Sequence, residues 1–291
     1  KRTVFFNQDP LAHQSLREVL KKLNPDLVHC HNLYHISLAP VNLSIEMQIP
    51  CIVTLHDYWP VCLNRALLKP DLHNCKESFW THCAFGCKHR RAGIPIIPFV
   101  VRGMHRRRRI LEEGSFLVSV SEFVRDALVR FGYSSHRIHV IHNGVDTDIF
   151  RPNEAKKKEK IVLFVGPSTE PKGIMHFAKA ARQIKSRFPD ARILAIGGAS
   201  FSQADESVEF IGRIPRKDLA GYYAAATCVC VPSLIPESHS MVAAEAMSCG
   251  TPIVAYRAGG LTELVEHGMT GFLANVGDWR ELAFYLSLIH I

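Results

Sequence analysis

The sequence predicts an α/β protein with two doubly wound domains that face a cleft. Apolar stretches typical of buried parallel strands alternate with amphipathic helical patterns along almost all of the 291 residues. One polar segment, RPNEAKKKEK at 151–160, interrupts this alternation near the middle. The chain is long enough to form two hydrophobic cores. We therefore place the domains at 1–146 and 147–291, with the boundary at about Val145–Arg151.

The first half contains the signals for two helices and four strands. Ser121 is the expected N-cap of the second helix, because a serine side chain accepts a hydrogen bond from a first-turn amide. Asn143–Gly144 favours positive φ and predicts the turn that ends the last strand. Four strands are few for a complete doubly wound domain, so we expect the N-terminus to be incomplete. We expect helices at 15–23 and 122–131, and strands at 26–31, 51–57, 115–121 and 137–146.

The second half repeats the alternation more regularly. Ser240 is a plausible N-cap, Gly250 ends the helix that follows it, and Pro252 prevents its continuation. The last helix begins at about Trp279 and reaches Ile291 without a capping residue, so this end also looks incomplete. We expect strands at 160–166, 191–198, 208–212, 227–233 and 252–257, and helices at about 173–187, 216–225 and 241–249.

The net charge of +8 is concentrated in the first half. The basic residues follow or precede an apolar stretch at 94–101, which suggests a peripheral contact with an anionic membrane surface; the alternative is a solvated helix face. No aromatic residues interleave with the arginines, so nucleic acid is not expected as a partner. No apolar run is long enough to cross a membrane, and we expect a cytoplasmic protein. The basic residues are Lys88, His89, Arg90, Arg91, Arg102 and Arg106–Arg109.

Two glutamates follow the strand predicted at 227–233. Ligands of doubly wound domains bind beyond the carboxyl ends of the strands, so the strand-to-helix loops are the places to search. Glu237 lies in such a loop and Glu245 in the second turn of the next helix, while the amides of 238–242 suit a phosphate. Glu245 can accept a hydrogen bond from a ribose diol, and Glu237 from a sugar hydroxyl. The alternative is that both are solvated surface glutamates.

Two further loops have the composition of a phosphate site. FVGPSTEPKGI at 164–174 is a strand, a tight loop and a helix start, and Lys172 arrives where its ammonium can meet a phosphate. YRAGGLTELV at 256–265 places Gly259–Gly260 after another strand, which allows a close approach of the backbone.

Four sequence segments occur along the chain in the same order as the motifs of a known family. VIHNGVDTDIFRP, FVGPSTEPKGI, VEFIGRIP and PESHSMVAAEAMSCGTPIVAYRAGGLTELVEHGMTGFL cover most of 138–275. Together they resemble the donor-binding domain of the retaining nucleotide-sugar glycosyltransferases of family four (group 1). That family has the GT-B fold, in which two Rossmann-like domains face a cleft.

The resemblance implies roles for residues that match the family motifs. Glu237 and Glu245 match its Glu-x7-Glu pair, which implies that Glu237 contacts the transferred sugar and Glu245 the nucleotide ribose. Lys172 matches the lysine that neutralises the donor diphosphate. His56, in VTLHDYWP at 53–60, resembles the strand-end histidine near the sugar and the acceptor, with Asp57 as a weaker candidate for orienting it; a structural hydrogen bond is the alternative role for His56. The remaining donor-binding candidates are Gly166, Ser238, His239, Ser240, Met241, Val242 and Arg213.

The chain departs from the family pattern at three places. Pro167 stands where the family usually has an arginine, so one cationic contact to the leaving group is missing unless Arg213 or another residue replaces it. Ser238–His239–Ser240 replaces a Gly-Phe-Gly-type run. The family's N-terminal glycine-rich turn is not in this sequence, which suggests a fragment.

The resemblance implies transfer of a sugar from a nucleotide-sugar donor to a saccharide or lipid-linked acceptor, with retention, in polysaccharide or glycolipid assembly. No metal is expected to be required, and the sequence has no Asp-x-Asp motif. Two alternatives stay open. One is a GT-B nucleotide-sugar epimerase, and the other is a non-catalytic nucleotide-sugar-binding scaffold, which Pro167 would favour.

Four cysteines cluster in a polar insertion at about 60–92. Cys62, Cys75, Cys83 and Cys87 could bind a structural Zn²⁺ tetrahedrally and stiffen a loop that lacks its own core. Free thiols and disulfides are the alternatives, because the spacing is not a regular double C-x2-C. The other cysteines lie in apolar segments and are expected to be small core residues.

Overall fold

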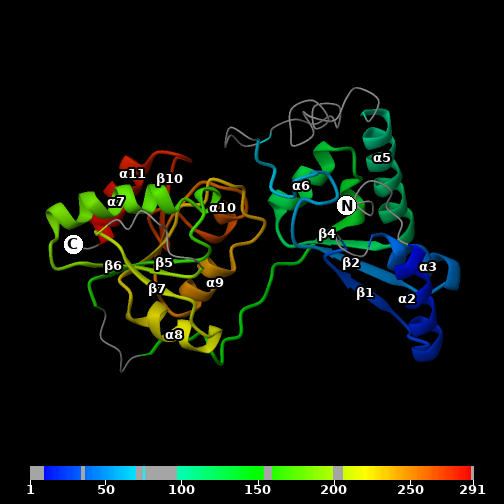
Figure 1. The fold of residues 1–291 in the computed structure, drawn as a ribbon, viewed down its shortest axis with the longest axis horizontal. Helices are drawn as coiled ribbons and strands as arrows, with labels where there is room; N and C mark the ends of the chain where they lie inside the picture. Colours follow the sequence, from blue (N-terminus) through cyan, green and yellow to red (C-terminus); the bar gives the residue numbers. More distant parts are fainter. Residues whose placement is uncertain are drawn as a thin grey trace. The chain divides into compact units, whose positions relative to one another are not determined.

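The computed structural model describes residues 10–33, 37–69, 75, 97–153, 159–198 and 206–289. The chain forms two compact units, Lys1–His142 and Asn143–Ile291, which are drawn together in Figure 1. Each unit has its own parallel sheet, as predicted, and each is described here by itself.

The first unit is built on four parallel strands in the order β1-β2-β3-β4. Their side chains alternate between a buried face, which includes Cys30 and Leu117, and a more open face with His31 and Phe116. Each strand lies within a predicted segment but is shorter than it. The strands are β1 (Val28–His31), β2 (Cys51–Leu55), β3 (Phe116–Ser119) and β4 (Ile138–Val140).

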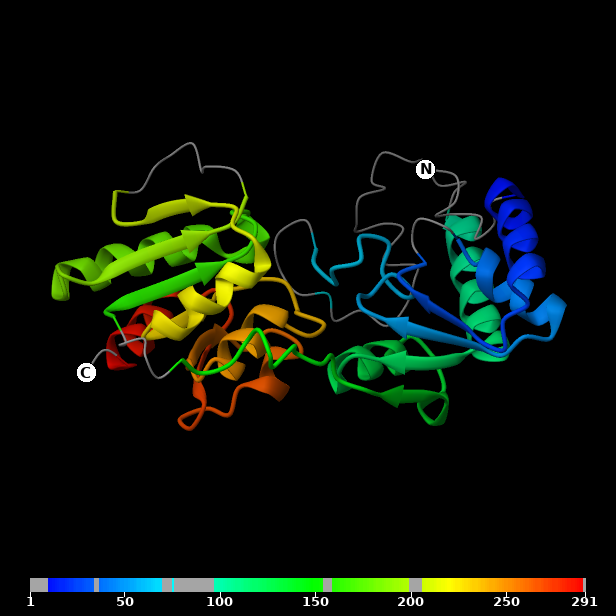
Figure 2. The ribbon, with the colours of Figure 1, turned by 90° about the horizontal axis from the view of Figure 1, so that it is seen from below.

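Four helices accompany this sheet. Because successive strands are neighbours, the general right-handedness of such connections places the helices that link them on one face. The α2, α3 and α5 helices pack beside one another, as Figure 2 shows. Two of the four were predicted, and Ser121 caps the last one by accepting a hydrogen bond from the Val124 amide at 3.1 Å. The helices are α2 (Pro10–Leu23), α3 (Ala39–Met47), α5 (Ile97–Gly114) and α6 (Glu122–Arg130).

The four consecutive arginines on α5 do not form one basic patch. Successive helical residues point about 100° apart, so Arg107 turns inward and is only 4% exposed. Its guanidinium donates to the Trp59 carbonyl at 2.6 Å and lies over the Trp59 ring. The expectation that all four arginines could meet a membrane is therefore wrong for Arg107. Arg102, Arg106 and Arg109 share the exposed face, and we call them the α5 arginine stripe.

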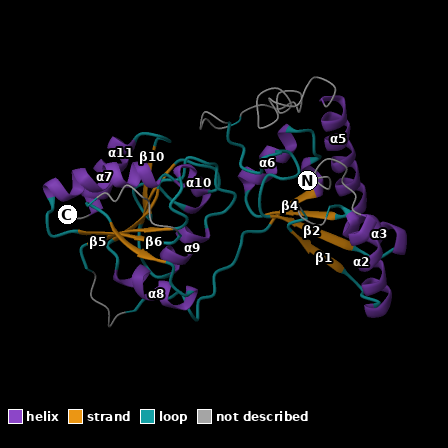
Figure 3. Ribbon diagram, viewed as in Figure 1, coloured by secondary structure: helices purple, strands orange, loops and turns teal. Residues whose placement is uncertain are grey.

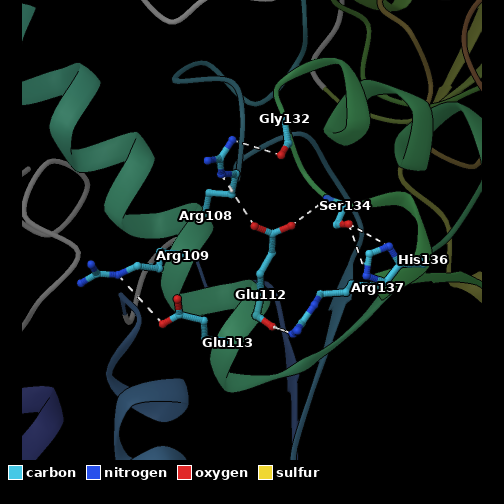
Figure 4. A network of polar contacts seen from close by, with 8 residues as sticks. All are labelled: Arg108, Arg109, Glu112, Glu113, Gly132, Ser134, His136 and Arg137. Carbon is cyan, nitrogen blue, oxygen red and sulfur yellow. Dashed lines mark hydrogen bonds and ion pairs between the residues drawn. The ribbon is translucent and has the colours of Figure 1, made fainter.

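Arg108 belongs to a network that ties α5 to the connection between α6 and β4 (Figure 4). It donates to the Gly132 carbonyl at 3.0 Å and lies 3.7 Å from the Glu112 carboxylate. Glu112 also accepts from the Ser134 amide at 2.7 Å. These bonds give Arg108 a structural role, which leaves the stripe as the outward-facing charge of the helix.

The second unit contains a six-stranded parallel sheet in the order β10-β9-β8-β5-β6-β7. The order runs outward in both directions from the β5–β8 pair, so the sheet is doubly wound with its switch point there. Five strands match predicted segments, whereas β10 was not predicted. The strands are β5 (Ile161–Val165), β6 (Arg192–Ile196), β7 (Glu209–Gly212), β8 (Cys228–Val231), β9 (Ile253–Tyr256) and β10 (Gly271–Ala274).

Helices cover both faces of this sheet. The α7 and α11 helices lie side by side on one face and α8 and α9 on the other, as Figure 3 shows. The buried side chains between them include Phe177, Tyr223 and Leu286. The helices are α7 (Ile174–Arg187), α8 (Arg216–Ala225), α9 (Met241–Ser248), the short α10 (Leu261–Leu264) and α11 (Trp279–Ile289). Within the described ranges, no helix combines the length and the apolar character needed to cross a bilayer.

Candidate functional site

A pocket of about 250 Å³ lies at the switch point of the second sheet. Its walls are the carboxyl ends of β5 and β8, the turn before α7 and the start of α9. This is the position at which doubly wound sheets bind ligands. Seven of the predicted site residues line the pocket: Gly166, Lys172, Glu237, His239, Ser240, Met241 and Val242. Pro167, where the chain departs from the family pattern, also lines it.

Lys172 and Glu237 form an ion pair in this pocket. The Lys172 Nζ atom lies 2.7 Å from Glu237 Oε1, and Ser233 donates its hydroxyl to the same carboxylate. The Glu237 side chain is only 12% exposed, so it is not a solvated surface glutamate. The pairing joins a cation and a carboxylate from loops 65 residues apart in sequence.

Gly173 fixes the approach of Lys172 to β8. It ends the short 3-10 turn Glu170–Lys172 with φ of 78°, a conformation that side chains disfavour. A Cβ atom there would clash with the Pro232 carbonyl. The turn is also bonded to the β8 loop, because the Leu234 amide donates to the Pro171 carbonyl at 2.9 Å.

The backbone of Glu237 is hydrogen-bonded to the loop that contains Gly259 and Gly260. Its amide donates to Ala258 at 3.2 Å, and its carbonyl accepts from the Gly260 amide at 2.7 Å. A Cβ atom at Gly259 or Gly260 would clash with the backbone of this segment. The Gly259–Gly260 pair was predicted to allow a close backbone approach, and the partner it approaches is the Glu237 loop.

The α9 helix presents its N-terminus to the same pocket. Ser240 is its N-cap, as predicted, and accepts from the Ala243 amide at 3.4 Å. The first amides of an α-helix have no partner inside the helix and carry partial positive charge. Those of Met241 and Val242 belong to residues that line the pocket. An anion in the pocket would therefore meet both Lys172 and a helix N-terminus.

Glu245 has different surroundings from Glu237. Its side chain is only 7% exposed and does not line the pocket. Oε1 accepts from Arg216 Nε at 3.0 Å and Nη2 at 2.8 Å, and Oε2 accepts from the Tyr223 hydroxyl at 3.3 Å. The structure therefore separates Glu245 from the pocket that Glu237 lines, and Glu245 is not a solvated surface glutamate either.

Three glycines bring the ends of β5, β6 and β7 together. The Gly166 amide donates to Ile196 and the Gly197 amide to Gly212, at 2.9 and 2.8 Å. A Cβ atom at Gly197 would clash with the Gly166 carbonyl, so residue 197 must remain glycine. Arg213 directly follows β7 and lies near Gly198; it is outside the lining of the pocket. Ser238 precedes His239 and is also outside that lining.

The first unit carries a cluster of three histidines at the ends of β1 and β2. His56 Nε2 lies 2.8 Å from His31 Nδ1, and His29 Nε2 lies 2.8 Å from Thr54 Oγ1. The rings of His29 and His31 are 4.2 Å apart. Parallel pairing places His31 beside Thr54, which brings it within reach of His56. His56 was predicted as a site residue, whereas His31 and His29 were not.

Burial, together with the neighbouring His31, lowers the pKa of His56, and the Asp57 carboxylate opposes this shift only in part. Burial and His29 lower the pKa of His31 as well. Burial raises the pKa of Asp57, although its bond from the Trp59 amide at 2.8 Å and its contact with Arg65 act in the other direction. The histidine pair is therefore biased toward its neutral form, in which it can donate and accept hydrogen bonds.

Two of the four clustered cysteines can be located. Cys62 and Cys75 are buried thiols in the core of the first unit, and burial raises the pKa of Cys62. The Cys62 thiol donates to Asn64 Oδ1 at 2.7 Å. Cys83 and Cys87 lie outside the described residues. Among those that are described, no group of three or more potential ligands is arranged to hold a metal ion.

Four residues that were not predicted from the sequence contact predicted site residues in one unit or the other. Ser233, Arg216, Tyr223 and His31 acquire their roles only through contacts between distant segments. Of these, His31 had the clearest signal available, because it ends a predicted strand beside the strand that ends near His56.

Family models match nearly the whole chain. The model for Glycosyltransferase Family 4 matches 3–149, and that for Glycosyl transferases group 1 matches 159–289. A D-inositol 3-phosphate glycosyltransferase from Mycobacterium sp. strain KMS is 35% identical over 200 residues, covering 59% of this chain and 44% of the relative. One of that name from Mycobacterium tuberculosis strain F11 is 32% identical over 213 residues, covering 64% and 43%. The matched part thus spans less than half the length of these curated relatives.

Solved structures agree with the predicted fold. Anabaena HepE in complex with UDP has a TM-score of 0.71 at 22% identity, covering 95% of this chain and 71% of that one. Its complex with UDP-glucose has a TM-score of 0.70 at the same identity, covering 96% and 74%. Sucrose-phosphate synthase from Thermosynechococcus elongatus has a TM-score of 0.65 at 22% identity, covering 96% and 67%. Identity this low establishes similarity of fold alone, and the fold is GT-B.

Proposed function

Because the chain belongs to glycosyltransferase family 4, we propose that the pocket at the β5–β8 switch point binds a nucleotide-sugar whose sugar is transferred, with retention, to a saccharide or lipid-linked acceptor. The observation that carries the proposal is the Lys172–Glu237 pair beside the N-terminus of α9. A cation, a carboxylate and helix amides are the groups that a sugar diphosphate needs.

Lys172 and the α9 amides act on the leaving group. Negative charge develops on the diphosphate as the glycosidic bond breaks, and preorganised positive groups stabilise it most where water is excluded. The half-buried Lys172 ammonium and the amides of Met241 and Val242 are positioned for this task. Arg213, at the end of β7, is our candidate for the second cation that Pro167 does not supply. This scheme requires no divalent metal.

Glu237 acts on the transferred sugar and Glu245 on the nucleotide ribose. Glu237 faces the pocket beside Lys172, so its carboxylate can accept a sugar hydroxyl next to the diphosphate. Glu245 lies one helical turn beyond Met241, on the same helix whose start meets the phosphate. His56, whose lowered pKa favours the neutral imidazole, is our candidate for contacts with the sugar and the acceptor.

A screen of ligands tests the proposal. UDP, GDP, ADP and their glucose conjugates are added to the full chain, and its thermal unfolding is followed. A specific ligand at a hundredfold excess over its Kd contributes about 2.7 kcal/mol of stability. Lys172→Met should abolish the response, whereas Lys179→Met, an exposed substitution on α7, should preserve it. Stabilisation by no nucleotide, or equal stabilisation of the Lys172 variant, would overturn the proposed site.

Turnover is tested separately by incubating the responding nucleotide-sugar with saccharide and lipid-linked acceptors. Release of the nucleoside diphosphate that depends on acceptor supports transfer, and the anomeric configuration of the product tests retention. An epimeric sugar formed without acceptor would instead identify an epimerase. Binding without either product would identify a scaffold.

We also propose that the α5 arginine stripe contacts an anionic membrane surface from the cytoplasmic side. The proposal is supported by the exposure of Arg102, Arg106 and Arg109 on one face of the helix, beside His105. Such a contact would bring a lipid-linked acceptor toward the enzyme while the donor arrives from the cytosol.

A further inference from the structure

The carboxylate of Glu245 is nearly saturated by hydrogen bonds from its own protein. Oε1 receives two bonds from the Arg216 guanidinium, at 3.0 and 2.8 Å, and Oε2 receives one from Tyr223 at 3.3 Å. A carboxylate offers about four acceptor positions, two on each oxygen. These contacts therefore leave about one position, on Oε2, for a ligand.

Arg216 is itself held in place. Its guanidinium carbon lies 5.1 Å from the centre of the Phe150 ring, which is fully buried. The Phe150 carbonyl accepts a hydrogen bond from Ser248 on α9. Arg216 at the start of α8 is thus fixed between Phe150 and Glu245. The Arg216 side chain is 57% exposed, so it is held by its two bonds to Oε1 and by stacking on Phe150 rather than by burial.

Tyr223 is equally constrained on the other carboxylate oxygen. The residue is fully buried, and burial together with the Glu245 charge raises the pKa of its hydroxyl, which stays protonated as a donor. Arg216 bonds to one oxygen of the Glu245 carboxylate and Tyr223 to the other, so α8 orients this carboxylate through two of its residues.

We propose that Arg216 is a positioning residue, because of which Glu245 accepts a hydrogen bond from one ribose hydroxyl rather than from both. The inference rests on the proposed function, in which Glu245 receives the ribose. Its new content is an asymmetry: one of the two hydroxyls of the nucleotide diol contributes to binding through Glu245, and the other does not. Arg216 sets this asymmetry by occupying Oε1.

The experiment measures calorimetric dissociation constants of the full chain for UDP, GDP and ADP and for their 2′-deoxy and 3′-deoxy forms. For the nucleotide that binds, loss of one hydroxyl should weaken binding about tenfold or more, since a hydrogen bond to a charged group is lost. Loss of the other should change the dissociation constant by less than about threefold. In Arg216→Met the two losses should become alike, because Oε1 is then available and the carboxylate is no longer oriented.

Two further variants separate positioning from folding. Lys217→Met, the exposed neighbour on α8, should keep the wild-type asymmetry. Arg216→Lys should restore part of it, because an ammonium can still occupy Oε1 but lacks the planar fork. A merely structural role of Arg216 would weaken all nucleotides by the same factor and leave the ratio of the two deoxy forms unchanged.

Equal losses for both deoxy forms in the wild type would overturn the inference while leaving the nucleotide site intact. So would an Arg216→Met variant that keeps the wild-type ratio. If no diphosphate binds the wild type, the proposed function itself fails, and this inference fails with it.

Discussion

The Lys172 ammonium lies 2.7 Å from the Glu237 carboxylate, although the two residues are 65 positions apart in sequence. The pair is half-buried on the lysine side and nearly buried on the glutamate side. In the absence of ligand the two groups neutralise each other. A sugar diphosphate would replace the carboxylate as the partner of Lys172 and release Glu237 to a sugar hydroxyl.

Glu237→Gln should lose turnover but keep nucleoside diphosphate binding. The amide keeps the shape of the side chain but removes the negative charge of Glu237. We propose that this charge acts on the sugar in the transition state, so kcat should fall about 10²-fold or more. Diphosphate affinity should stay within about tenfold of the wild type and shift toward tighter binding, because Lys172 loses its competing anion. Initial rates and titration calorimetry measure the two effects. Glu266→Gln is the exposed control, and wild-type turnover by Glu237→Gln would contradict the assignment.

Gly173→Ala should destabilise the second unit by about 2–5 kcal/mol. Part of the cost is the left-handed backbone, about 1–2 kcal/mol, and the rest is overlap of the new methyl with the Pro232 carbonyl. Gly268→Ala separates the two terms, because Gly268 has φ of 85° but nothing within 4 Å of the added atom. Urea denaturation followed by circular dichroism gives the free energies of unfolding. Equal losses in the two variants would show that the Pro232 contact is unimportant.

The strands and the loops that line the pocket were predictable because their signals are local. Continuous apolar runs mark β5 and β8, and Ser240 and Gly250 mark the ends of α9. The α3 helix was missed because its buried face includes the polar Ser44 and its exposed face the apolar Ile45, so no amphipathic period appears in the sequence. Pro98 and the run of arginines obscured the helical pattern of α5, and the strand β10 was also missed.

The partners of the site residues were less predictable than the residues themselves. Glu245 was predicted as a site residue from its spacing to Glu237, whereas its bonds to Arg216 and Tyr223, which come from another helix, were not predicted. A spacing rule gives positions along one segment and contains no information about which distant side chain packs against it. The same limit explains why His56 was predicted without His31.

The cysteine insertion should hold about one equivalent of zinc. Cys62 and Cys75 are buried in the core of the first unit, and we propose that Cys83 and Cys87 complete the set of ligands. Inductively coupled plasma mass spectrometry of protein purified without chelator measures the metal. Cys83→Ser with Cys87→Ser should remove it, and Cys228→Ala, in the second unit, should leave it unchanged. A zinc content far below one equivalent, together with four titratable thiols, would contradict the proposal.

Replacing the α5 arginine stripe with alanine should abolish binding to anionic vesicles. Each basic side chain near such a surface contributes about 1 kcal/mol, so three contribute about 3 kcal/mol and the binding should weaken at high salt. Co-sedimentation with phosphatidylserine-containing and neutral vesicles measures it. A matched triple, Lys179, Arg182 and Arg187 to alanine on α7, should bind like the wild type. Equal binding by the stripe variant, or none by the wild type, would show an ordinary solvated face.

The paired histidines should make the chain less stable as the pH falls below about 6.5. The pKa values of His31 and His56 are lowered by folding, so below the unfolded value the unfolded chain takes up protons first. Stability is therefore retained above the unfolded pKa and lost as the pH falls through the folded pKa values. The 2.8 Å contact adds to this loss, since two imidazolium rings cannot donate to each other.

The double variant His31→Asn, His56→Asn should lose less stability than the wild type between about pH 7 and pH 5. Asp57→Asn serves as the opposite control, because its raised pKa favours the folded state as the pH falls, so removing it should steepen the loss. Urea denaturation at several pH values gives the slopes, and parallel slopes for the wild type and the double variant would refute the assignment.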